Sequence, residues 1–276
     1  MLLRSVRIAI DYNRGLALPI RVGHGAWQFI TGVTGPIWAW SGRGDRSIWA
    51  RPMLVALLIA AVLVPIDGVV SSGARAIPMG GDIRRVLIWL QEYGGLASLV
   101  VVAAVIWLLD PANRRRLADL AVAVVASSAA VFVAKIMIGR PRPAMADLFS
   151  TGSFLGPFGA APVDGAMRHA WDLLAPGVSN LQSMPSSHTA AAVVLSVFLY
   201  RLYPRLKPLA IAMPIVVGVC RVLFGAHYAS DVAIGAGVGL AIGQVALIGC
   251  WGTRLLGRSD AIPDESPAQQ VPETRA

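Results

Sequence analysis

Charged residues are scarce in this sequence. Only 14% of its 276 residues are Asp, Glu, Lys or Arg, whereas 56% are hydrophobic, and the apolar residues form long runs. Most of such a chain could not remain in water as one globular domain, which excludes an ordinary soluble enzyme or binding module. The composition therefore predicts an all-α integral membrane protein.

Cysteine and histidine are also rare. The two cysteines, Cys220 and Cys250, lie in apolar segments, which is typical of buried small side chains and not of a disulfide. No CxxC or HExxH pattern occurs, and we expect neither a bound metal nor a cofactor. Of the four histidines, His188 and His227 stand at the ends of hydrophobic segments next to polar residues, which makes them candidates for chemistry.

A helix that rises about 1.5 Å per residue needs about 20 apolar residues to cross a hydrocarbon layer of about 30 Å. Six segments are candidates for such spans. The second is interrupted by Gln91, Glu92 and two glycines, so we expect its first part to be tilted or interfacial. The expected spans are residues 53–71, 88–109, 117–138, 187–204, 208–225 and 229–251.

The other parts of the chain flank or connect this bundle, which we expect at residues 51–252. Residues 1–50 contain arginines and four tryptophans, and predict an interfacial segment on the cytoplasmic side, not a cleavable signal peptide. Residues 253–276 are polar and contain three prolines, which predicts a disordered cytoplasmic tail. The long loop 139–186 is rich in Gly, Ala and Pro and is expected to cover a site.

The basic residues predict the orientation. Apart from Lys135, Arg142 and Arg221, 16 Lys and Arg residues fall on the side that holds both termini and 5 on the opposite side. Because cytoplasmic segments carry the excess of basic residues, we expect an inner (plasma) membrane protein with both termini in the cytoplasm. The net charge of +9 then reflects topology and contact with membrane lipids, and we expect no nucleic-acid partner.

Three short blocks place cations, two histidines and one carboxylate at the ends of hydrophobic segments: residues 135–143 (KIMIGRPRP), 185–188 (PSSH) and 221–231 (RVLFGAHYASD). Counted from the cytoplasmic starts of their spans, Lys135 and Arg221 lie roughly 20 to 27 Å across the membrane. All three blocks are therefore expected to meet at the outer (periplasmic) face. Charged groups gathered at one depth indicate a functional site.

Each residue also has a structural alternative. Lys135 could be an anchor that reaches toward the interface, and Arg142 could be an ordinary loop arginine. A guanidinium such as that of Arg221 costs about 2.5 to 3.5 kcal/mol in an apolar span, so it needs an anionic partner. Asp231 is one candidate and a bound phosphate is another. His227 and Asp231 could form a structural pair, since on a helix a carboxylate four residues on can accept the imidazole N–H.

The three blocks resemble the motifs K-x6-R-P, P-S-G-H and S-R-x5-H-x3-D of the type 2 phosphatidic acid phosphatase superfamily, in the same order and with similar spacing. Two positions depart from the motifs, since Ser187 stands where the family has glycine and Cys220 where it has serine. The charged and proton-transferring positions all match: Lys135, Arg142, His188, Arg221, His227 and Asp231. The resemblance covers residues 117 to 245.

This resemblance implies a mechanism. His227, oriented by Asp231, attacks phosphorus to form a phosphohistidine, and His188 protonates the leaving oxygen. No metal is required, because fixed donors stabilise the phosphate oxygens. The implied substrate is a lipid phosphate, with phosphatidic acid, phosphatidylglycerol phosphate, a polyprenyl pyrophosphate and a lipid A phosphate all open. The expected phosphate-binding residues are Lys135, Arg142, Ser186, Ser187 and Arg221.

Two other functions stay open. A phosphotransferase would use the same phosphohistidine but pass the phosphoryl group to a second lipid. A transporter or channel would also contain intramembrane charges, but it predicts polar residues along the whole depth of a pathway. The sequence indicates no oligomeric state. Asp231, Gly235, Gly239 and Gly243 share one face of the last span, which predicts close packing against a central helix.

Overall fold

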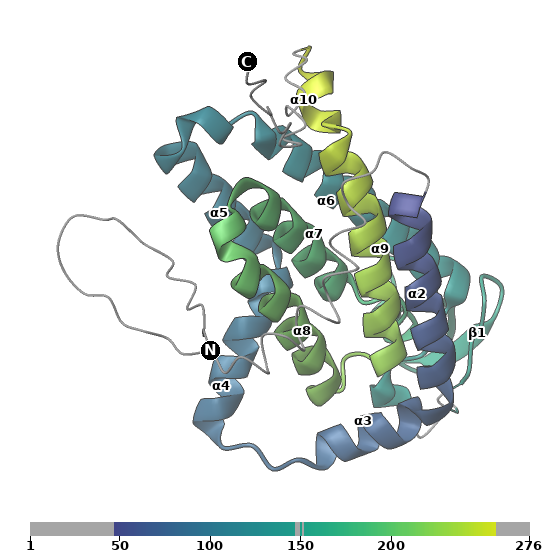
Figure 1. The fold of residues 1–276 in the computed structure, drawn as a ribbon. Coiled ribbons are helices and arrows are strands. Elements are labelled where there is room, and N and C mark those ends of the chain that lie inside the picture. The colour runs from purple at the N-terminus through teal and green to yellow at the C-terminus, as the bar shows by residue number, and fades with distance from the viewer. Residues whose placement is uncertain (1–46, 147–149, 151, 258–276) are drawn as a thin grey trace, which may run out of the picture. The chain divides into compact units, whose positions relative to one another are not determined.

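The computed structural model describes residues 47–146, 150 and 152–257 (Figure 1). The predicted interfacial segment lies outside these residues, except for its last four, which begin the first described helix. Nine α-helices make up most of the described chain: α2 (Ser47–Leu63), α3 (Asp67–Ala76), α4 (Gly81–Gln91), α5 (Leu96–Leu109), α6 (Arg116–Ile138), α7 (Ser187–Leu202), α8 (Lys207–Leu223), α9 (Ala229–Ile248) and α10 (Trp251–Leu255).

The helices confirm an integral membrane bundle, so the chain is a multi-pass membrane protein. Within the described residues, four helical stretches are long and apolar enough to cross a membrane: Ile48–Ala76, Arg116–Met145, Pro204–Leu223 and Ala229–Ile248. A fifth span is possible if Gly81–Gly94 and Leu96–Leu109 are counted together, although they are bent by 65°. The bend falls at Gly95, whose backbone is extended, next to the polar residues that predicted an irregular second span. The fourth expected span, residues 187–204, is α7, which is apolar but only 16 residues long.

Helices α7 and α9 form the buried centre of the bundle, and α9 packs against α2 on its other side (Figure 1). The glycines of α9 make this approach possible, as predicted. A Cβ atom on Gly235 would lie 2.5 Å from the Ser186 carbonyl oxygen, and one on Gly239 would lie 2.5 Å from the Ala190 carbonyl oxygen. Such contacts hold membrane helices together through van der Waals packing, because lipid provides no hydrophobic driving force between them.

The loop 139–186 contains a small β-hairpin that an all-α prediction does not include. Strand β1 (Ala160–Val163) pairs antiparallel with β2 (Ala166–His169). Asp164 and Gly165 connect the strands with φ angles of 49° and 79°, and an Asp-Gly pair between apolar residues is a sequence signal for such a turn. The hairpin and the adjoining 3-10 turn η6 (Val178–Leu181) share a small apolar core, which orders the loop before α7 begins.

The chain stays folded beyond residue 253, so the predicted start of a disordered tail is wrong. Thr253 lies in α10 and is buried. Its backbone N–H and hydroxyl donate to the two carboxylate oxygens of Asp119 at 2.8 and 2.9 Å, and Arg116 pairs with the same carboxylate at 2.9 Å. These bonds attach α10 to the start of α6. Residues from 258 onward lie outside the described part of the chain.

Candidate active site

The end of α6 places Lys135 and directs the chain into the loop. Gly139 has a left-handed backbone with φ of 55°, and its N–H donates to the Lys135 carbonyl oxygen at 2.9 Å. This is a helix end that glycine adopts without strain, and a Cβ here would lie 2.7 Å from the Gly156 carbonyl oxygen. Lys135 is only 7% exposed, and its Nζ donates to the Gln182 carbonyl oxygen at 2.6 Å.

The turn between α8 and α9 joins Arg221 to His227. Gly225 has φ of 65°, which reverses the chain direction after α8. The backbone N–H groups of Ala226 and His227 then both donate to the Arg221 carbonyl oxygen at 3.1 Å. The Arg221 guanidinium donates to Gln91 at 3.2 Å, from the end of α4, so the interrupted second span also contributes to the site.

His227 has the geometry of a nitrogen nucleophile. Its Nδ1 lies 2.7 Å from the Ser183 carbonyl oxygen, which can only accept, so the proton sits on Nδ1 and Nε2 keeps its lone pair. Within the described residues, Nε2 is buried and has no hydrogen-bond partner. Burial lowers the pKa of His227 to about 4, although the nearby Asp231 carboxylate opposes this shift. At neutral pH the ring is therefore uncharged.

The predicted hydrogen bond from His227 to Asp231 is not present. Nδ1 is 3.7 Å from the nearer Asp231 oxygen, which is an electrostatic contact but too long for a hydrogen bond. The prediction assumed that both residues lie on one helix, whereas α9 begins at Ala229. Asp231 accepts instead from the Tyr228 N–H at 2.9 Å and from the Ser183 hydroxyl at 2.5 Å. Ser183 thus contacts both the imidazole and the carboxylate.

A buried guanidinium holds the other oxygen of Asp231. Arg140 donates to Asp231 Oδ1 at 2.6 Å, to the Ser230 hydroxyl at 2.6 Å and to Asp67 Oδ2 at 2.8 Å. All three charged side chains are fully buried. The Arg140 guanidinium also lies 4.3 Å from the centre of the Tyr228 ring. One cation therefore links α3 to the start of α9 through two carboxylates.

Asp67 and Arg140 are not among the residues predicted from the sequence. The signal for Asp67 is its position in the first predicted span, because an ionisable residue in a membrane helix is a functional candidate by default. Arg140 was not predicted because the K-x6-R-P motif matches Arg142, two residues later, and assigns no role to Arg140. Ser183 lies just before the second block and contributes a backbone oxygen, a role that no residue pattern reveals.

The start of α7 carries the second block. Ser186 is fully buried and is the N-cap, and its hydroxyl oxygen accepts from the Thr189 hydroxyl at 2.9 Å and from the Thr189 N–H at 3.4 Å. Its own hydroxyl proton remains available for a ligand. Ser187 is exposed at the first turn and His188 is half-buried. Gly94 packs on this turn, since a Cβ there would clash with the His188 carbonyl oxygen.

Lys135, Arg142 and Arg221 form a group of cations, which we call the cation cluster. Lys135 interacts electrostatically with both arginines, and His188 interacts with all three cations. Among residues 47–146, 150 and 152–257, no ion pair joins any of the three to a carboxylate, and the Nε atoms of Arg142 and Arg221 are buried without a hydrogen-bond partner. Mutual repulsion makes such a cluster unfavourable without an anion.

A helical membrane bundle with this cluster beside a neutral imidazole is what a membrane enzyme acting on a phosphate group requires. A family model described as the PAP2 superfamily matches residues 116–253, half of the chain, and the protein belongs to that superfamily. It is accordingly a phosphoric ester hydrolase, and the resemblance inferred from the three blocks is confirmed. The matched region includes the blocks but not Asp67.

Comparison with solved structures gives two similar membrane proteins. The crystal structure of LpxE from Aquifex aeolicus is 18% identical, with a TM-score of 0.48, and the match covers 67% of this chain and 94% of that one. A transmembrane PAP2 type phosphatidylglycerolphosphate phosphatase from Bacillus subtilis is 19% identical, with a TM-score of 0.49, covering 72% and 94%. No curated protein matches the sequence. The family assignment rests on the family model, because both structural similarities are weak.

Proposed function

We propose that the protein is a metal-independent lipid phosphatase that hydrolyses a phosphomonoester or pyrophosphate headgroup through a phosphohistidine on His227. One observation carries the proposal. The hydrogen bond from Nδ1 to the Ser183 carbonyl oxygen leaves Nε2 unprotonated, buried and without a partner among the described residues. A neutral imidazole held in one tautomer next to three cations suits attack on phosphorus.

The reaction has two steps. In the first, Nε2 of His227 forms a bond to phosphorus while the bond from phosphorus to the lipid oxygen breaks, and His188 donates a proton to that oxygen. In the second, water attacks the phosphohistidine, His188 takes a proton from the water, and inorganic phosphate leaves with the N–P bond broken. Asp231 acts on His227 at a distance of 3.7 Å and through Ser183, which both residues contact.

The phosphate oxygens are expected to occupy the position between the cation cluster and the start of α7. The cluster neutralises the charge of the transferring group, which is the main requirement of phosphoryl transfer. The hydroxyl of Ser186 and the backbone N–H of Ser187 add donors at the N-terminus of a helix, where an anion is favoured. We place this site at the outer face of the inner membrane, with both termini in the cytoplasm.

The decisive experiment measures phosphate release from a panel of lipid phosphates by the purified protein in detergent with EDTA. The panel contains phosphatidic acid, phosphatidylglycerol phosphate, undecaprenyl pyrophosphate and lipid A. We expect activity in EDTA, its loss in His227→Ala, and a phosphohistidine in acid-free quenched reactions with ³²P-labelled substrate. Strict dependence on Mg²⁺, or activity above a few per cent in His227→Ala, would contradict the mechanism.

A further inference from the structure

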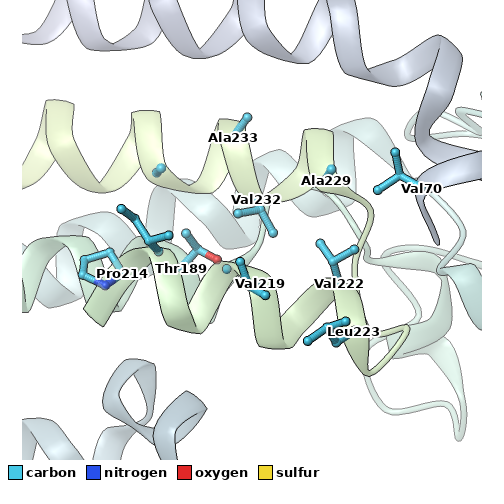
Figure 2. A pocket seen from close by; sticks show the side chains of 12 residues that line it. Val70, Thr189, Pro214, Val219, Val222, Leu223, Ala229, Val232 and Ala233 are labelled. Atoms are coloured by element: carbon cyan, nitrogen blue, oxygen red, sulfur yellow. The ribbon is translucent and has the colours of Figure 1, made fainter. Parts of the chain in front are cut away.

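An apolar cavity of about 460 Å³ lies between α8 and α9 (Figure 2). Thr189 is the one residue with a polar side chain among those that line it. We propose that this cavity, the α8–α9 groove, holds the hydrocarbon chain of the substrate, an inference that rests on the proposed lipid phosphatase function. Four helices line the groove, among them Val70 of α3, Thr189 of α7, Pro214, Val219 and Leu223 of α8, and Ala233 of α9.

One end of the groove adjoins the candidate active site. Leu223 and Ala229 line the groove, and each lies two residues from a predicted site residue, Arg221 and His227 respectively. Thr189 connects the groove to the site directly, because its hydroxyl donates to the Ser186 hydroxyl oxygen at 2.9 Å. Figure 2 shows Thr189 farther along the groove, between Pro214 and Val219. A headgroup at the cation cluster would therefore place its first methylene groups between Thr189 and the Leu223 end of the groove.

The other end reaches toward the middle of the membrane. The lining extends along α8 from Leu223 to Pro214, nine residues or about 14 Å, and along α9 from Ala229 to Ala236, about 10 Å. The length along α8 is nearly half the thickness of a hydrocarbon layer of about 30 Å. Val219 is 51% exposed on the lining, so the groove opens sideways to the bilayer and a lipid can reach it without leaving the membrane.

Charge distinguishes this groove from a second cavity near the site. That cavity, of about 440 Å³, is lined by Glu92, Tyr93, Ala97 and Met213 among others. It also adjoins α7, because the hydroxyl of its lining residue Tyr93 lies 2.9 Å from the Ser196 hydroxyl of that helix. Glu92, however, places a carboxylate at its wall, which repels a phosphate headgroup, whereas the α8–α9 groove has no charged lining residue.

The test uses n-butyl phosphate and n-hexadecyl phosphate, which share a headgroup and differ only in chain length. Ala233→Phe fills the groove with a phenyl ring, and Ala97→Phe makes the same change in the second cavity as a matched control. We expect Ala233→Phe to lower kcat/KM for the long substrate by about tenfold or more, with little change for the short one. Ala97→Phe should leave the ratio of kcat/KM for the long substrate to kcat/KM for the short one as in the wild type.

Each contrary outcome identifies what fails. If the wild type hydrolyses neither alkyl phosphate nor any lipid in the panel, the proposed function itself is wrong. If the wild type is active but Ala233→Phe affects both substrates equally, the groove does not hold the chain. If Ala97→Phe instead selectively lowers kcat/KM for the long substrate, the chain lies in the second cavity. If Ala233→Phe changes the oligomeric mass of the protein, the groove is an interface with a second copy. If Ala233→Phe fails to fold, Val219→Trp at the half-exposed wall tests the same point.

Discussion

Replacing Arg140 with lysine keeps the positive charge but removes the planar guanidinium that donates hydrogen bonds to Ser230, Asp231 and Asp67. The contacts to Ser230 and Asp231 are each 2.6 Å and the contact to Asp67 is 2.8 Å. An ammonium group is a point donor on a flexible stem and cannot reproduce this fork. We expect Arg140→Lys to reduce turnover by loosening Asp231, and with it the position of Ser183 and His227.

The magnitude follows from the bonds that are lost. A hydrogen bond to a charged group contributes about 1.5 to 3 kcal/mol. If one such hydrogen bond is lost and its whole free energy is lost from the stabilisation of the transition state, kcat falls by roughly 10- to 100-fold. KM should not change, because Arg140 is fully buried behind Asp231 and does not reach the predicted phosphate position.

Arg142→Lys is the matched comparison, two residues along the chain. Arg142 belongs to the cation cluster, so this variant should raise KM as well as lower kcat/KM. The assay is initial-rate phosphate release in detergent, with thermal unfolding of each variant as the check on folding. Asp67→Asn should resemble Arg140→Lys, because it weakens the same network from α3. A rise in KM for Arg140→Lys equal to that for Arg142→Lys, or a wild-type kcat, would refute this reasoning.

Three further predictions concern pH, topology and packing. Burial lowers the pKa of His227 to about 4, and the nucleophile must be unprotonated to react. In a pH profile of kcat/KM corrected for substrate ionisation, activity should therefore fall on the acidic side only near pH 4. A fall near the usual histidine pKa of about 6.5 would contradict a buried neutral nucleophile. A cysteine at Met167 in the hairpin, 63% exposed, should react with an impermeant thiol reagent added outside intact cells, whereas one at Leu255 in α10, 79% exposed, should not; the reverse labelling would place the site in the cytoplasm. Gly239→Val should lower the thermal unfolding temperature markedly, because even a Cβ would lie 2.5 Å from the Ala190 carbonyl oxygen of α7; an unchanged unfolding temperature would show that α7 and α9 can separate at little cost.

The hydrophobic pattern determined most of the helical architecture. Apolar runs long enough to cross a membrane must satisfy their own backbone hydrogen bonds, so each predicted span is helical in the structure, with boundaries that differ by several residues. The glycine spacing on α9 likewise predicted a close helix neighbour, since small residues at every fourth position leave one face without side chains. These are local properties, which a sequence displays directly.

Motif spacing similarly determined which residues are candidates for the site. Lys135, Arg142 and Arg221 are charges in or beside apolar segments, where an ionisable residue is a candidate for function by default. The motif spacing did not predict which groups these site residues contact. It suggested Asp231 as the acceptor for His227, and this was wrong because the chain leaves the α8 helix and turns before α9 begins at Ala229.

Only the tertiary structure decided how the nucleophile is held. The Ser183 carbonyl oxygen sets the His227 tautomer, and the Arg140 guanidinium binds Asp231 together with Asp67, a residue 73 positions earlier than Arg140. Backbone atoms carry no residue signature, and a buried ion pair depends on which helices pack together, not on their order in the chain. The sequence therefore supplied the candidate catalytic and phosphate-binding residues, while helix packing added Asp67, Arg140 and Ser183 and determined which groups touch.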